Sequence, residues 1–155
     1  MNFKCRNFLN EYLASLPKEE VVNYKSFSSD YFCSDEKNAN ICADLIVNGL
    51  KTASCSMYYW YSNMEEPMPI VGHLQVVTDW DGNPVCVIEI ESVSFCRFCE
   101  VDEKFALEEG EGDRTIAWWR EAHWEFFSRE CEELGIEPTE DMMLVLERFR
   151  VVFKR

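Results

Sequence analysis

The sequence predicts an α+β fold in which a partly closed, mostly antiparallel β-sheet has helices packed outside it. Three observations predict this fold. The chain has 155 residues, 47% of them apolar and 14% aromatic, which suits one hydrophobic core and therefore one domain. Apolar residues recur at helical spacing in the first third and around residues 101–134, and they alternate with period two elsewhere. The resulting order of elements lacks the regular β–α alternation of a doubly wound parallel sheet.

Two helices are expected before the first strand. Apolar residues over 2–16 lie close to helical spacing, and Pro17 ends the pattern. Residues 18–33 mix aromatic and polar side chains and predict an irregular segment. A second helix is expected after Ser34, a suitable N-cap, and it ends at Asn48-Gly49, where glycine suits the left-handed C′ position.

The middle of the chain predicts three strands. Period-two patterns place them at 53–60, 74–78 and 85–95, with a loop over 63–69. The second and third strands are separated by a stretch that contains Asp81-Gly82. Because an Asp-Gly step favours a tight turn, these two strands are expected to form a hairpin.

The last third of the chain predicts two helices and a closing strand. A short helix fits residues 101–108. Asp113 is a suitable cap for a long helix over 114–134, which Gly135 closes. A final strand is expected over 142–153, where the alternation of apolar residues returns.

The net charge of the chain is −14, from 29 acidic and 15 basic residues. A negative field repels polyphosphate chains, so long, nonspecifically bound nucleic acid is a disfavoured partner, whereas a nucleoside-sized ligand or a short RNA is compatible with it. No run of about eighteen apolar residues exists, and the first residues lack the apolar core of a secretion signal. We therefore expect a cytoplasmic protein with no membrane partner. The sequence does not indicate an oligomeric state.

Eight cysteines require an explanation in a protein expected to be cytoplasmic. Cys42 lies on the apolar stripe of a predicted helix, and Cys55 and Cys86 lie in predicted strands, where free thiols pack as small apolar groups. Cys96 and Cys99 form a C-x-x-C pair, and zinc sites usually need a second such pair or two histidines. Structural thiols and zinc or redox chemistry both stay open for this pair, and no metal site or cofactor is predicted.

Two stretches carry a resemblance to a known family. The first, Asn48-Gly49-Leu50-Lys51-Thr52-Ala53-Ser54, resembles the G-x-K-x-x-[TS] signature of the ASCH superfamily. The second runs from Phe105 through Glu-Gly-Glu-Gly-Asp-Arg to the Trp-Trp and His-Trp-Glu-Phe-Phe groups, and it is similar to a bacterial branch of that family. The resemblance covers roughly residues 35–153. It identifies residues 1–155 as a single ASCH domain, with the signature at 49–54 and the helix over 2–16 as an extension.

The resemblance implies a PUA-like β-barrel with a cleft next to the G-x-K junction. Members of the family have been linked to RNA binding and to ribonuclease activity, and a short branch removes the acetyl group from acetylated cytidine nucleosides. The catalytic group of that branch carries over to Lys51, Ser54 and Glu109. The present chain differs at Ser54, where the amidohydrolases have threonine, and at Ser56, where they have arginine.

Amide hydrolysis needs a nucleophile, a base and stabilisation of the oxyanion. Ser54 is the predicted nucleophile, and Lys51, if it loses its proton in a dehydrated cleft, is the predicted base. Glu109 then either positions Lys51 or passes a proton to the leaving amine. Purely structural roles stay open for all three: Lys51 at the carbonyl end of a helix, Ser54 on one face of a strand, and Glu109 in a solvated acidic turn.

Five further residues are predicted to contact a ligand: Thr52, Ser56, Arg114, Trp119 and His123. Within the long helix, the stripe of Trp118, Ala122 and Phe126 is expected to pack in the core. The neighbouring stripe of Trp119, His123 and Phe127 either packs as well or lines the cleft, where a ring can stack on a base.

The sequence thus leaves three functions open. The first is an amidohydrolase for an acylated nucleoside. The second is a non-catalytic binding module for RNA or a modified nucleoside. The third is a ribonuclease, in which Lys51 with Arg114 or Arg120 would stabilise charge on the phosphorus.

Overall fold

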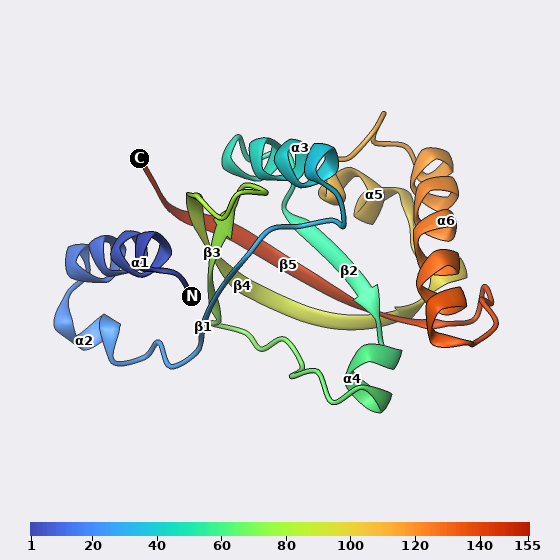
Figure 1. Ribbon diagram of the computed structural model, residues 1–155, viewed down its shortest axis with the longest axis horizontal. Coiled ribbons are helices and arrows are strands. Elements are labelled where there is room, and N and C mark those ends of the chain that lie inside the picture. The colour runs from blue at the N-terminus through green and yellow to red at the C-terminus, as the bar shows by residue number, and fades with distance from the viewer.

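A computed structural model describes residues 1–155 as one open, twisted sheet with helices packed around it (Figure 1). The sheet has five strands in the order β1-β3-β4-β5-β2. The pair β1 and β3 is parallel, and the other three pairs are antiparallel, as the sequence predicted for most of the sheet. The strands are β1 (Phe27–Asp30), β2 (Ala53–Met57), β3 (Leu74–Thr78), β4 (Pro84–Arg97) and β5 (Met143–Lys154).

The two longest strands, β4 and β5, pair with each other in the middle of the sheet (Figure 1). Their register shifts between Val87 and Ile88 and again between Ile90 and Ser92. Such bulges bend a strand and increase its twist. The sheet therefore curls, as in a barrel, but does not close, and β1 and β2 remain its two edges.

Helices cover the sheet at both ends. At one end lie α1 (Phe3–Ser15) and the short α2 (Lys18–Val21), and at the other α5 (Glu103–Glu109) and α6 (Ile116–Leu134) (Figure 1). Between them α3 (Glu36–Val47) packs over β3, β4 and β5, and the short α4 (Tyr59–Asn63) follows β2. A single 3-10 turn, Phe98–Glu100, ends β4.

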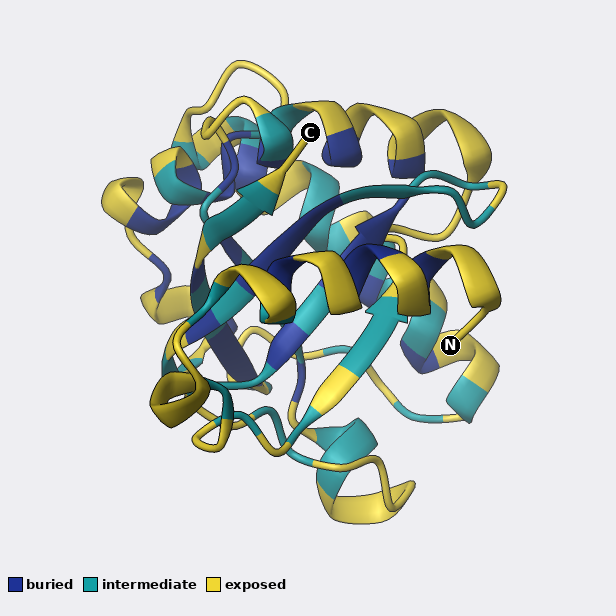
Figure 2. Ribbon diagram, turned by 90° about the vertical axis from the view of Figure 1, so that its left-hand side faces the viewer, coloured by how far each residue is buried: buried dark blue, intermediate teal, exposed yellow.

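Three apolar clusters join these helices to the sheet. Apart from the short α2 and α4, which have no buried residue, the helices turn their buried residues towards the strands and their exposed residues outward (Figure 2). One cluster holds α1 against β3 and β4, a second holds α3 against β3, β4 and β5, and the largest packs α5 and α6 against β2 and β5. The predicted α+β class, with helices outside a mostly antiparallel sheet, is confirmed.

The structure corrects four predictions of local structure. The segment 18–33 is not wholly irregular, because Phe27–Asp30 pairs with β3. The strand predicted over 53–60 ends at Met57, where α4 follows almost at once. Asp35, not Ser34, caps α3, and Thr115, not Asp113, caps α6. Asp113 instead accepts hydrogen bonds from the backbone N–H and the hydroxyl of Thr115, and so holds the cap in place.

None of the helices combines the length and the apolar character that crossing a membrane requires.

Candidate active site

Lys51 lies just beyond the C-terminus of α3, at the entry to β2. Gly49 adopts a left-handed conformation with φ +74°, which ends the helix. The backbone N–H groups of Leu50 and Lys51 both donate to the Leu45 carbonyl. The backbone N–H of Lys51 therefore bonds to a carbonyl at the end of α3, and the side chain extends into the interior. The residue is only 2% exposed.

Glu109 is the last residue of α5 and meets Lys51 because two chain segments pack closely. Gly110 follows with φ +70°, and a Cβ at this position would lie 2.2 Å from the Leu50 carbonyl oxygen. The Thr52 N–H donates to the Glu108 carbonyl at 2.7 Å and fixes the same contact. Glycine at 110 is thus required for the G-x-K junction and the Glu-Gly-Glu-Gly segment to lie side by side.

The ammonium of Lys51 lies between two carboxylates. Its Nζ is 3.1 Å from Oε2 of Glu109, which is 1% exposed, and 3.0 Å from Oε2 of Glu111. The second oxygen of Glu109, Oε1, is buried without a hydrogen-bond partner. A buried charge is costly unless it is paired, so this arrangement requires Lys51 and at least one carboxylate to be ionised together.

His123, on α6, completes the cluster from the other side of Glu109. Its Nδ1 donates to the Trp119 carbonyl at 2.9 Å, and its Nε2 lies 3.4 Å from Oε2 of Glu109. Because Nδ1 already carries a proton, Nε2 approaches the carboxylate favourably only when it is protonated too. His123 therefore favours the imidazolium form in this setting.

The protonation states follow from burial and charge. Burial alone would lower the pKa of Lys51, but the charges of Glu109 and Glu111 outweigh it and hold this pKa above its ordinary value. Burial alone would raise the pKa of Glu109, but Lys51 and His123 bring it below its ordinary value. Burial raises the pKa of Glu111. Lys51 is therefore a cation and Glu109 an anion near neutral pH, so to act as the predicted base Lys51 would have to release its proton beside two carboxylates.

This cluster lines a cavity of about 350 Å³. Three aromatic side chains, Phe32, Trp118 and Phe126, form part of its wall. The ionisable groups that line it, besides two cysteines, are Asp35, Lys51, Glu109, Glu111, His123, Glu125 and Arg129. Its size lies near the lower end of the range for small-molecule sites, and it combines apolar walls with a few convergent polar groups.

Some of the predicted site residues meet at this cavity. Lys51, Ser54, Glu109 and His123 all line it. No hydrogen bond joins Ser54 to Lys51 or Glu109. Thr52 lies beside the junction, where its hydroxyl donates to the Glu108 carbonyl.

Two other predicted ligand contacts, and Arg120 of the ribonuclease hypothesis, lie elsewhere. The hydroxyl of Ser56 pairs with that of Tyr61 at 2.7 Å, away from the cavity lining. Arg114 is exposed, with φ +68°, and Arg120 is exposed as well; neither lines the cavity. Of the three cations named for the ribonuclease hypothesis, only Lys51 lines the cavity.

The packing of the two stripes of α6 differs from the prediction. Trp119 is 1% exposed and Phe127 is 0% exposed, and both belong to the largest core cluster. Trp118, Ala122 and Phe126, expected in the core, line the cavity instead. Of the predicted ligand contacts on α6, only His123 lines the cavity. Both stripes have helical spacing, and the spacing does not specify which of two adjacent faces meets the sheet.

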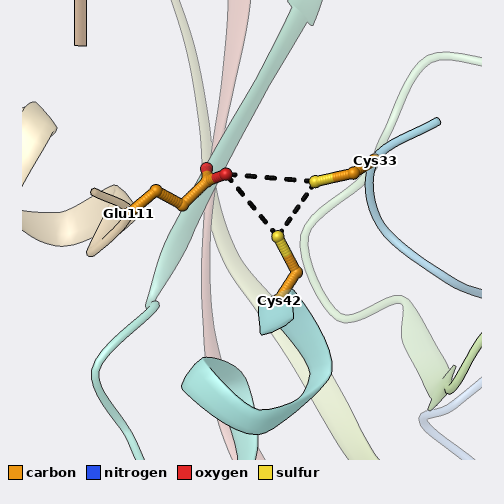
Figure 3. A group of neighbouring side chains, drawn as sticks. All are labelled: Cys33, Cys42 and Glu111. Atoms are coloured by element: carbon orange, nitrogen blue, oxygen red, sulfur yellow. Dashed lines mark hydrogen bonds between the residues drawn. The ribbon is translucent and has the colours of Figure 1, made fainter. Parts of the chain in front are cut away.

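The sequence missed two groups of site residues. The sequence does not distinguish Glu111 from the other acidic residues of its turn, although it is two positions from Glu109 and binds the same ammonium. Cys55 lies close to Glu109 and His123, with its ligand atom within 4.8 Å of theirs, and Cys33, Cys42 and Glu111 form a second such group (Figure 3). Both groups contain residue types that bind metals. Cys96 and Cys99 belong to neither.

Comparisons with known proteins agree with this fold. A family model described as the ASCH domain matches residues 28–153. The crystal structure of an ASCH domain from Lactobacillus crispatus JV V101 is 62% identical, covers 98% of this chain and 96% of its own, and superposes with a TM-score of 0.96. A protein from Enterococcus faecalis V583 is 28% identical, with coverage of 95% and 84% and a TM-score of 0.77.

A more distant structure agrees in fold alone. The ASCH protein from Zymomonas mobilis is 12% identical over 80% of this chain and 65% of its own, with a TM-score of 0.50. Among curated proteins, none matches the chain.

Proposed function

Because the chain belongs to the ASCH domain family, we propose that its cavity binds a nucleoside-sized ligand and hydrolyses an acyl amide on it, as in acetylcytidine. The observation that carries this proposal is the Lys51 ammonium, held between two carboxylates at the wall of a 350 Å³ cavity. Ionisable groups whose pKa values are shifted in opposite directions within one cleft are typical of catalytic sites.

The lining favours a ligand without phosphate. Four carboxylates, of Asp35, Glu109, Glu111 and Glu125, line the cavity, against three cations, those of Lys51, Arg129 and protonated His123. The whole chain also carries a net charge of −14. A phosphorylated ligand would be repelled by both, whereas a neutral nucleoside would not. Trp118 and Phe126 on the wall offer faces on which a base can stack.

Lys51 is assigned the stabilisation of the oxyanion. A cation fixed in a dry site stabilises the charge that develops on the carbonyl oxygen during attack on an amide. Glu109, on its far side, keeps the ammonium charged and oriented, and it is therefore a positioning residue. This assignment replaces the role of base, which would require Lys51 to release its proton against two adjacent carboxylates.

Ser54 is assigned the nucleophile, and Glu111 the base. The Ser54 hydroxyl attacks the acyl carbon and passes its proton to Glu111, and the oxyanion meets Lys51. The C–N bond then breaks as the amine takes the proton from Glu111, and water, which gives a proton to Glu111, releases the acyl group from Ser54 as the acid. Glu111 suits proton transfer better than Glu109, because burial raises the pKa of Glu111 towards neutrality and Lys51 lowers that of Glu109.

Deacetylation of acetylcytidine is the direct test. The purified protein is incubated with this nucleoside, and the release of cytidine is followed by chromatography. Lys51→Met and Ser54→Ala should each lower kcat/KM by at least about 100-fold. The matched controls are Lys104→Met and Ser62→Ala, both exposed and outside the cavity, which should retain the wild-type rate. Equal rates for Lys51→Met and Lys104→Met would disprove the catalytic proposal.

One observation favours a second candidate, a binding module that does not turn its ligand over. Ser54 makes no hydrogen bond to a base in the unliganded site. Calorimetric titration of nucleosides into the protein separates the two functions. Saturable binding that Phe126→Ala weakens, with no product formed by the wild type over hours, assigns the cavity to recognition alone.

A further inference from the structure

Two thiols lie close together beside the ion-pair cluster, and one of them, Cys33, lines the cavity. Cys33 lies in the connection between β1 and α3 and is exposed, and Cys42 lies on α3 and is 1% exposed. Their sulfur atoms are 2.9 Å apart (Figure 3). Both thiols point towards the carboxylate of Glu111, as the figure shows. This arrangement brings together a solvent-accessible thiol, a buried thiol and a carboxylate.

The separation is short for two unbonded thiols. A disulfide bond is about 2.05 Å long, so the sulfurs need to approach by less than about 1 Å to form one. Cys33 has φ +72°, a conformation that a non-glycine residue adopts only where the surrounding structure fixes it. The backbone conformation at Cys33 thus contributes to the short distance between the two sulfur atoms.

We propose that Cys33 and Cys42 form a redox-reactive pair that a peroxide converts to a disulfide, with Glu111 as the base of the second step. This chemistry uses neither Lys51 nor Ser54. It stands or falls independently of the proposed hydrolysis.

Exposure decides which sulfur reacts first. Cys33 is accessible, so its thiolate, having lost its proton to solvent, attacks one oxygen of hydrogen peroxide. The O–O bond breaks, hydroxide leaves, and Cys33 becomes a sulfenic acid with its sulfur oxidised by two electrons. Cys42 is buried and cannot meet the peroxide first.

Glu111 supports the second step. Cys42 donates a hydrogen bond to Oε1 of Glu111 at 3.6 Å. Its neighbour Cys33, burial and Glu111 all raise the pKa of Cys42, so this thiol retains its proton until a base removes it. As Cys42 attacks the sulfenic sulfur, its proton passes to Glu111 and then to the departing hydroxide. In total, two thiols and one peroxide give one disulfide and two waters.

The rest of the chain offers no comparable pair. Cys99, in the C-x-x-C motif, is exposed, but its thiol contacts Asp141 at 3.9 Å and makes no contact with another sulfur. Cys5, Cys86 and Cys131 are buried singly. Oxidation should therefore select Cys33 and Cys42 among the eight cysteines.

The disulfide would also change the surroundings of Lys51. Glu111 accepts from the thiols through Oε1 and from Lys51 through Oε2, so one carboxylate connects the two groups. Oxidation removes both thiol donors from Oε1. If the proposed function holds, the oxidised protein therefore differs from the reduced one in the group that accepts the proton of Ser54.

The test is peptide mapping of the reduced full-length protein after treatment with hydrogen peroxide. Free thiols are alkylated under denaturing conditions before digestion. The expected result is loss of two hydrogens from the intact mass and one cross-linked peptide joining Cys33 to Cys42. The double variant C96S/C99S should give the same cross-link at the same rate. Oxidation spread evenly over the other cysteines, with no such cross-link, overturns the proposal.

Three variants separate the steps. Cys42→Ser should stop at the sulfenic acid of Cys33, which dimedone traps, and Cys33→Ser should leave Cys42 unmodified. Glu111→Gln should slow closure of the disulfide at least about tenfold while leaving the first step unchanged. Thermal unfolding confirms that each variant is folded. One equivalent of zinc in the purified protein, lost in Cys33→Ser, would assign the group to a metal and overturn the redox reading.

Discussion

At one end of the sheet, α1 packs Phe8 and Leu9 against Val76 and Val87, and no charged side chain is buried in this contact. At the other end, between α3, α5 and α6, the contact includes a lysine and a glutamate that are buried to the same degree. Burying an apolar side chain stabilises a fold by about 1.5–3 kcal/mol. A buried ion pair adds little net stability, because desolvation offsets the attraction between the charges.

This difference indicates that the α1 contact serves the stability of the fold and that the Lys51 cluster serves a chemical function. The α1 contact needs nothing beyond shape and apolar area to explain it. The Lys51 cluster holds a protonated amine, one unpartnered carboxylate oxygen and a partly exposed second carboxylate beside a cavity. An apolar core would fill the same space without the cost of desolvation, so the cluster indicates function. Four predictions test this comparison.

The largest effect is expected from breaking the ion pair on one side. Lys51→Met leaves Glu109 buried without its cation, and we expect a loss of about 3–5 kcal/mol in the free energy of unfolding. The double variant K51M/E109L removes both charges and should recover most of that loss. Urea unfolding measures both. A double variant as unstable as the single one would show that the pair itself stabilises the fold.

The second prediction concerns stability at the end of the sheet that α1 covers. Phe8→Ala removes a ring that is 2% exposed and contacts Phe153 edge-on, and it should lower the free energy of unfolding by about 3 kcal/mol. The rate of acetylcytidine hydrolysis per folded molecule should not change. A fall in that rate equal to the one in Lys51→Met would mean that the two ends are coupled.

A third prediction concerns pH. Glu147 of β5 pairs across the sheet with Ser54, and burial raises its pKa to about 7 from 4.5, against the opposing charge of Lys51. The folded state thus favours neutral Glu147, and this contribution is complete below about pH 4.5 and lost as the pH rises through 7. Glu147→Gln should therefore be more stable than the wild type at pH 8 by on the order of 1–3 kcal/mol, and no more stable at pH 4. Exposed Glu103→Gln is the control.

The smallest effect compares two helix caps. Asn2 accepts from the Cys5 N–H at the start of α1, and Thr115 accepts from the Trp118 N–H at the start of α6. Replacing either with alanine should cost about 1 kcal/mol in thermal unfolding. Only Thr115→Ala should also weaken hydrolysis, because α6 carries His123. Equal activity in both variants would show that the N-cap of α6 does not affect the position of His123 in the site.

The amino-acid sequence by itself determined most of the elements and their order, but not the short elements α2, β1 and α4. The alternation over 74–78 predicts a strand, and the glycines at 49 and 135 predict helix ends, because both signals depend only on residues close in the chain. The structure has β3 at Leu74–Thr78, and α3 and α6 end just before those glycines. The resemblance also placed Lys51, Ser54 and Glu109 at one cleft, and all three line the same cavity.

Only the tertiary structure decided the chemistry of that cavity. Helical spacing gives two apolar stripes on α6, but the fit of Trp119 and Phe127 into the core decides that Trp118 and Phe126 line the cavity. The charge of Lys51 depends on two carboxylates about sixty residues away in the chain. Pairings between distant segments depend on how the segments pack, and no local pattern of residues specifies that packing.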